Sequence, residues 1–153
     1  MTRLRQRGFT LIELLVTVMI LSILVGVAVP LARNSVKRQK EIELREDLRL
    51  MRAAIDKYKD LSDRGFIMVK VDTDGYPETL QVLVEGVQLV GQVDKKVKFL
   101  RRIPIDPMTN SPEWGQRSVQ DDAKSNSWGG QNVFEVYTKS EGTGLDGTKY
   151  NEW

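Results

Sequence analysis

A lone carboxylate interrupts the longest apolar stretch of this chain. Glu13 is the only charged residue between Phe9 and Ala32, and leucine, valine and isoleucine dominate the remainder. A charged side chain in a bilayer costs about 2.5–3.5 kcal/mol at the midplane on insertion scales, and less near an interface. Such a residue usually pairs with another group, so the position of Glu13 indicates that a partner is needed.

Cleavage of the chain between Gly8 and Phe9 would create a cationic partner. The new amino group on Phe9 would lie four residues before Glu13, which is one helical turn and suits a contact along one helix face. A neighbouring chain could supply the amine equally well, if helices stack with an axial offset. In either case proteolysis would make a cation that pairs with a fixed carboxylate.

The stretch that carries Glu13 is long enough to cross a membrane. Residues 9–32 exceed the roughly 20 residues that a helix needs to span the hydrocarbon core. Arg3, Arg5 and Arg7 precede this stretch, which predicts a cytoplasmic N-terminus. A cleaved secretory signal, with its small-residue site at 25–28, and an uncleaved signal anchor are two other interpretations. Neither explains Glu13.

Residues 7–16 read RGFTLIELLV and resemble the cleavage and methylation motif of type IV pilins and type II secretion pseudopilins. In that family a membrane aspartyl peptidase, the prepilin peptidase, cuts after the glycine and methylates the new N-terminal phenylalanine. The resemblance implies that Gly8 precedes the cut and that Phe9 is methylated. It also implies that Glu13 pairs with the N-terminus of a neighbouring subunit.

The helix is expected to continue beyond the membrane as an amphipathic helix. Apolar residues recur at spacings of four, three, four and three, which places them on one helix face. They are Leu44, Leu48, Met51, Ile55 and Tyr58. We expect this stripe to pack against the C-terminal region, and a free-standing coiled coil is the alternative. Turn residues at 62–65 end the pattern.

Gly26 and Pro30 lie late in the apolar stretch. A proline inside a helix removes one main-chain hydrogen bond and clashes with the preceding turn, which predicts a kink or local melting there. Alternatively, Pro30 marks the exit from the bilayer.

Four segments follow from these patterns. Residues 1–8 are expected to be a basic leader that prepilin peptidase removes, and residues 9–32 a transmembrane and filament-core helix. Residues 33–62 continue as the amphipathic helix, and residues 63–153 form a β-rich globular region.

Strand and turn patterns are short in the C-terminal region. Residues 132–138 alternate as a half-buried strand does, residues 72–75 read as a turn, and a helix could open at Pro77. Residues 121–126 read as a polar loop. We expect an antiparallel sheet of about three strands on the amphipathic helix. The predicted fold is therefore α+β and pilin-like.

A second resemblance covers most of this region. Tyr76-Pro77, the LRRIPIDP segment at 100–107 and the LDGTKYNEW segment at 145–153 are jointly similar to the major (G-type) pseudopilins of type II secretion. The resemblance implies a structural subunit of a pilus-like filament that drives protein export across the outer membrane. A surface pilin for adhesion, motility or DNA uptake is the alternative.

The resemblance also implies partners and a location. The partners are other copies in a helical filament, the prepilin peptidase, the inner-membrane assembly platform and minor pseudopilins. The location is a single-pass anchor in the inner membrane, with the N-terminus in the cytoplasm and the C-terminal domain in the periplasm. The filament is expected in the periplasm or at the cell surface.

Typical major pseudopilins bind calcium in the C-terminal loop. Asp146 matches the aspartate before the loop glycine, and Glu135 stands where a strand aspartate occurs. Calcium takes six to eight oxygen ligands, yet Lys149 occupies the stretch where the family has an acidic pair. A turn at Asp146, with Trp153 anchoring the tail, is therefore favoured over a calcium site, and no other cofactor is expected.

Composition argues against an enzyme. The chain has no histidine and no cysteine, and it contains no glycine-rich phosphate loop and no serine elbow. The net charge is only +2, so no nucleic-acid partner is expected. One basic cluster is favoured as a solvated face over a nucleic-acid site; its members are Lys95, Lys96, Lys98, Arg101 and Arg102.

Overall fold

The computed structural model describes residues 8–91 and 96–153, without the side chains of Val27, Val29 and Pro30. The leader segment up to Arg7 and Lys95 of the basic cluster lie outside the described residues. The chain forms two compact units, Met1–Arg38 and Gln39–Trp153.

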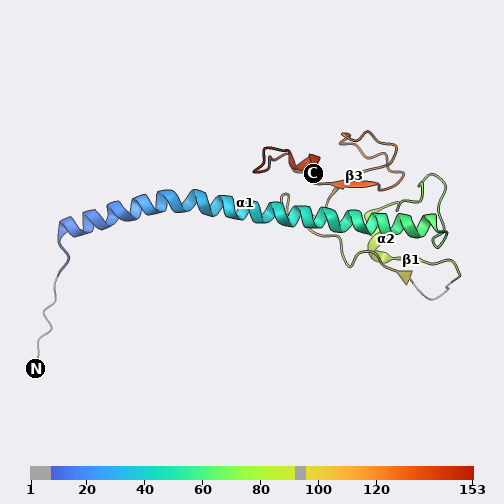
Figure 1. Ribbon diagram of the computed structural model, residues 1–153, viewed down its shortest axis with the longest axis horizontal. Helices are drawn as coiled ribbons and strands as arrows, with labels where there is room; N and C mark the ends of the chain where they lie inside the picture. Colours follow the sequence, from blue (N-terminus) through green and yellow to red (C-terminus); the bar gives the residue numbers. More distant parts are fainter. Residues whose placement is uncertain (1–7, 92–95) are drawn as a thin grey trace, which may run out of the picture. The chain divides into compact units, whose positions relative to one another are not determined.

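One helix, α1, covers Leu11–Asp63 and includes 53 residues. Figure 1 shows it as a single continuous helix. It contains an 18-residue window with a mean hydropathy of 2.7, and it is long and apolar enough to cross a membrane. The helix is unbroken at Gly26 and Pro30, so the prediction of local melting is wrong for this structure. A proline removes a single main-chain bond, and the flanking turns keep theirs. The kink stays a prediction.

The end of α1 agrees with the predicted turn at 62–65. The N–H of Phe66 donates to the carbonyl of Leu61, and the N–H of Gly65 donates to the carbonyl of Ser62, both at 2.9 Å. Gly65 has φ of 74°, the left-handed conformation that favours glycine at this position. A local capping motif therefore ends the helix.

The predicted apolar stripe is confirmed as core. Leu44, Leu48, Met51 and Ile55 are at most 1% exposed. They pack in one cluster with side chains from the rest of the second unit, among them Leu83, Leu100, Trp114, Val133 and Val136. The second half of α1 is thus a core helix of the globular head.

The strands of the head form two separate ladders. Strand β1 (Val87–Gln88) pairs antiparallel with β2 (Lys96–Val97). Strand β3 (Gly115–Arg117) pairs antiparallel with β4 (Glu135–Tyr137). The α+β fold with small antiparallel sheets is confirmed, but a single sheet of three strands is wrong.

The chain between the two ladders explains that difference. Pro104, Pro107 and Pro112 lie between β2 and β3, and proline cannot donate to a ladder. Figure 1 shows β3 and the C-terminus on one side of α1 and α2 and β1 on the other. Each ladder therefore covers its own side of the helix.

The remaining elements are short. Helix α2 is Leu80–Glu85, so it begins three residues after the predicted start at Pro77. A 3-10 helix, η1, covers Tyr150–Glu152. The turn at 72–75 is confirmed, since Asp72, Asp74 and Gly75 all have positive φ.

A buried carboxylate organises the segment that follows Pro104. Asp106 is fully buried and accepts hydrogen bonds from the N–H of Met108 at 2.8 Å and the hydroxyl of Thr109 at 3.0 Å. The hydroxyl of Thr138, next to β4, also donates to it. Asp106 therefore fastens this turn to the β3–β4 ladder.

Candidate functional site

The first candidate site is the start of α1, which carries the predicted cleavage motif. Gly8, Phe9 and Thr10 precede the helix, and Phe9 is 81% exposed. A Cβ built on Gly8 would meet nothing within 4 Å. Within the described residues, packing therefore does not require glycine at position 8.

Thr10 caps the start of the helix. The hydroxyl oxygen of Thr10 accepts a hydrogen bond from the N–H of Glu13 at 3.3 Å, and the carbonyl of Thr10 accepts one from Leu14 at 3.1 Å. A threonine followed three residues later by glutamate is a common helix start. A carboxylate in the first turn also interacts favourably with the helix dipole. The helix therefore begins two residues after Phe9.

The polar side chains that follow Glu13 bond to their own helix. The hydroxyl of Thr17 donates to the carbonyl of Leu14 at 2.9 Å, and that of Ser22 donates to the carbonyl of Val18 at 2.8 Å. The carboxylate of Glu13 has no hydrogen bond or ion pair within residues 8–91 and 96–153. Glu13 is thus the residue of this apolar segment whose polar side chain lacks a hydrogen-bond or ion-pair partner in the described chain.

The apolar surface around Glu13 is bare. Large hydrophobic side chains are exposed along the first half of α1, including Leu11, Ile12, Leu14, Leu15, Val18, Met19, Leu21, Ile23 and Leu24. A contiguous apolar surface of this size marks contact with a membrane or with another protein. Lipid and neighbouring helices can both cover it.

The second candidate site is the contact between the C-terminal loop and the second half of α1. Glu41 is 9% exposed, and its carboxylate accepts hydrogen bonds from the N–H of Leu145 at 2.8 Å and the hydroxyl of Tyr150 at 2.9 Å. Burial first, and then the hydrogen bond to Glu41, raise the pKa of Tyr150 to about 12. The phenol therefore stays protonated at physiological pH.

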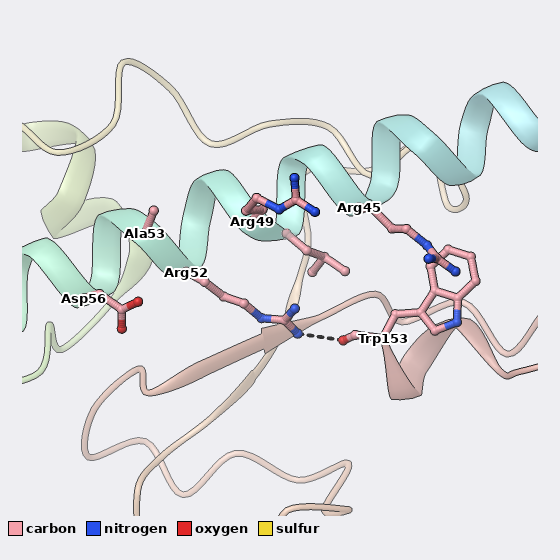
Figure 2. Close-up of a pocket in the computed structure, with 7 residues that line it drawn as sticks. Arg45, Arg49, Arg52, Ala53, Asp56 and Trp153 are labelled. Carbon is pink, nitrogen blue, oxygen red and sulfur yellow. Dashed lines mark hydrogen bonds between the residues drawn. The ribbon is translucent and has the colours of Figure 1, made fainter.

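Two arginines of α1 complete this contact, and Figure 2 shows both beside Trp153. Arg45 donates to Asp146 at 3.0 Å, and its guanidinium lies 4.0 Å from the centre of the Trp153 ring. Arg52 donates to Glu135 at 2.7 Å and to the main-chain oxygen of Trp153 at 2.6 Å. The loop is thereby attached to the helix at several points.

The two residues predicted as calcium ligands belong to different ion pairs. Asp146 pairs with Arg45, whereas Glu135 pairs with Arg52, seven residues or about 10 Å further along the helix. Among the residues that the structure describes, no three acidic, histidine or cysteine side chains are grouped so as to hold a metal ion. The donor set does not fit calcium, which requires six to eight oxygens.

Sequence reasoning missed the roles of Glu41, Arg45 and Arg52. All three flank the buried stripe that includes Leu44 and Leu48, and long charged side chains at such a border can reach over the apolar surface. Their place at the border of the stripe was the one feature of the sequence that could have indicated these roles. Their partners lie at least 83 residues away in the chain, so no local pattern could identify them. The described members of the basic cluster, Lys96, Lys98, Arg101 and Arg102, are exposed.

Comparisons with known proteins match the N-terminal segment and most of the chain. A family profile described as "Prokaryotic N-terminal methylation motif" matches residues 3–29, which include the predicted cut and Glu13. No solved structure matches the chain significantly.

Similar curated proteins share one description, "Type II secretion system core protein G". The protein of Pseudomonas aeruginosa is 33% identical over 115 residues, which cover 72% of this chain and 73% of the relative. The protein of Klebsiella pneumoniae is 31% identical over 67% and 69% of the two chains. The protein of Escherichia coli is 32% identical over 69% of each. This chain therefore belongs to the family of the type II secretion system core protein G, the major pseudopilins.

Proposed function

We propose that this chain is a structural subunit of a type II secretion pseudopilus, cut after Gly8 and methylated at Phe9 before it assembles. The observation that supports this proposal most is the unpartnered carboxylate of Glu13 in the first turn of α1. Thr17 and Ser22 bond to their own helix, whereas the carboxylate of Glu13 has no hydrogen bond or ion pair among the described residues. The amine that cleavage creates on Phe9 is a group of the right charge.

Assembly would use two interactions of different kinds. The pairing of the Phe9 amine of one copy with Glu13 of the next sets the axial position of each subunit, because a desolvated charge pair tolerates little misplacement. The exposed apolar side chains of the first half of α1 supply most of the cohesion when they pack against other copies. The same surface holds the subunit in the membrane before assembly.

The topology follows from the charge pattern. The N-terminus faces the cytoplasm, α1 crosses the inner membrane, and the head of residues 39–153 lies in the periplasm. The prepilin peptidase, the inner-membrane assembly platform and minor pseudopilins act on or with this subunit. The role is mechanical: growth of the filament pushes secreted proteins toward the outer membrane. We propose a structural role and no enzymatic reaction for this chain.

Substitution of Glu13 tests the proposal. The variant Glu13→Gln, produced together with a prepilin peptidase and an assembly platform, should insert and be cut normally but form few or no filaments. Filaments are counted by electron microscopy of sheared fractions. Thr17→Val is the matched control, because it changes a neighbouring polar side chain whose hydroxyl bonds only within α1. Normal filaments from Glu13→Gln would refute the assigned role of Glu13.

A further inference from the structure

In the C-terminal loop of the head, residues 142–153, groups of the chain itself balance the negative charge of Asp146, and no metal ion is needed for it. Both carboxylate oxygens of Asp146 already accept hydrogen bonds. Oδ1 accepts from the N–H of Thr148 at 3.0 Å and from its hydroxyl at 2.6 Å. Oδ2 accepts from Arg45 at 3.0 Å. These donors lower the pKa of Asp146, those of Thr148 most, and each of its two carboxylate oxygens has a partner within the chain.

The second predicted ligand is occupied in the same way. Oε1 of Glu135 accepts from Nε of Arg52 at 2.7 Å and from the N–H of Val136 at 2.8 Å. Arg52 also binds the main-chain oxygen of Trp153. A cation on Glu135 would have to displace a guanidinium that fastens two other parts of the head. Each of the two carboxylates predicted as calcium ligands is therefore paired with an arginine.

Arg45 contacts the loop on two faces of its guanidinium group. One nitrogen pairs with Asp146, and Cζ lies over the Trp153 ring, 4.0 Å from its centre. Figure 2 shows the guanidinium beside that ring. A planar guanidinium can pair and stack at once, whereas an ammonium group is a compact point charge. The loop therefore suits an arginine at this position better than it suits other positively charged side chains.

The loop also closes on itself around this contact. The N–H of Gly144 donates to the carbonyl of Thr148 at 2.7 Å, and Nε1 of Trp153 donates to the hydroxyl of Thr148 at 2.6 Å. The rings of Tyr150 and Trp153 meet edge to face, with centres 5.0 Å apart. Tyr150 then contacts α1 through Glu41, and Trp153 contacts it through Arg45 and Arg52.

We infer that Arg45 is the internal cation of this loop, and that the head of this pseudopilin folds and holds its C-terminal loop without calcium. The carboxylate that would bind the metal is neutralised from α1 instead. Charge, stacking and loop closure then depend on the chain alone, so the ion content of the periplasm does not control the fold of the head. The inference does not depend on the filament role of Glu13.

Thermal unfolding of the full-length mature chain in detergent micelles tests this inference. The transition is followed by tryptophan fluorescence, with calcium at about 5 mM, above the affinity range of extracellular calcium modules, and again with a chelator. A loop that bound calcium at such concentrations would unfold several degrees higher with the ion than without it. We expect the two transitions to coincide, and isothermal titration with calcium to show no binding.

Two arginine variants separate the internal cation from general charge effects. Arg45→Gln should lower the Tm by about 2–5 °C, and Arg45→Lys should recover only part of the loss because lysine pairs but stacks less well. Arg49→Gln is the matched control, since Arg49 lies one turn further along the same exposed face and makes no hydrogen bond or ion pair with the described residues. We expect its Tm to stay within about 1 °C of the parent.

Three results would overturn the inference. One is a calcium-dependent rise of the Tm in the parent chain. Another is saturable calcium binding that Asp146→Asn abolishes. The third is an equal effect of Arg45→Gln and Arg49→Gln on the Tm.

Discussion

The main-chain N–H of Glu13 donates to the hydroxyl of Thr10 at 3.3 Å, while the carboxylate of Glu13 has no partner in the described chain. One residue therefore serves two purposes. Its main chain helps to start α1 close to the predicted cut, and its side chain stays available at the first turn. A helix that begins this close to Phe9 keeps a new amine on the same turn as the carboxylate.

Removal of the Thr10 cap should loosen the start of α1. In Thr10→Val the first turn loses a side-chain acceptor, a change that costs about 0.5–2 kcal/mol in other helices. Amide exchange of Glu13 and Leu14, measured by NMR in micelles, should accelerate roughly tenfold. The control Thr17→Val should leave those amides unchanged. Equal exchange in Thr10→Val and the parent chain would mean that Thr10 does not cap the helix.

The buried pair of Glu41 and Tyr150 predicts a specific dependence of stability on alkaline pH. The pKa of Tyr150 is raised from its ordinary value of 10.0 to about 12. The folded state thus favours the protonated phenol, and this contribution is complete below pH 10 and lost as the pH rises through about 12. Tyr150→Phe should lower the Tm below pH 10 and flatten its decline between pH 10 and 12.

Tyr137→Phe provides the comparison for that experiment. Tyr137 is also buried, but its hydroxyl makes no hydrogen bond in the part of the chain that the structure describes. Below pH 10, Tyr137→Phe should therefore change the Tm much less than Tyr150→Phe, because only the Tyr150 hydroxyl donates to Glu41. Parallel Tm profiles of the parent and Tyr150→Phe across the alkaline range would contradict the assignment.

Gly115 is required by a close approach across the β3–β4 ladder. It pairs with Tyr137, and a Cβ at Gly115 would lie 2.3 Å from that ring. Gly115→Ala should destabilise the head by about 1–3 kcal/mol through overpacking, as measured by denaturant unfolding. The loss should shrink in a Tyr137→Leu background, where the ring is absent. The same loss in both backgrounds would show that the cause lies elsewhere.

The sequence predicted local features well because they depend on neighbouring residues. The stripe from Leu44 to Tyr58 and the capped end of α1 near Gly65 both follow from short periodicities and turn chemistry. The strand predicted at 132–138 is shorter in the structure, where β4 covers Glu135–Tyr137. The number of sheets could not be predicted from these local patterns. Strand pairing depends on the path of the chain after β2, and the prolines there set that path. A local pattern holds no such information.

The candidate sites divide in the same way. The cleavage motif from Gly8 to Glu13 is contiguous, so residue types and spacing were sufficient to propose its chemistry. The sequence predicts Asp146 and Glu135 as calcium ligands, but the fold attaches each to a different arginine of α1. That outcome depends on contacts between residues that are 83 and 101 positions apart, and the sequence alone gives no means of ranking such partners.

We propose that cleavage after Gly8 converts this chain into a filament subunit. Intact mass and N-terminal sequencing of the protein, recovered from membranes of cells with an active prepilin peptidase, test this proposal. We expect a chain that begins at Phe9 and carries one additional methyl group. A chain that still includes Gly8 and the basic residues before it would contradict the proposal and leave only a membrane-anchored protein.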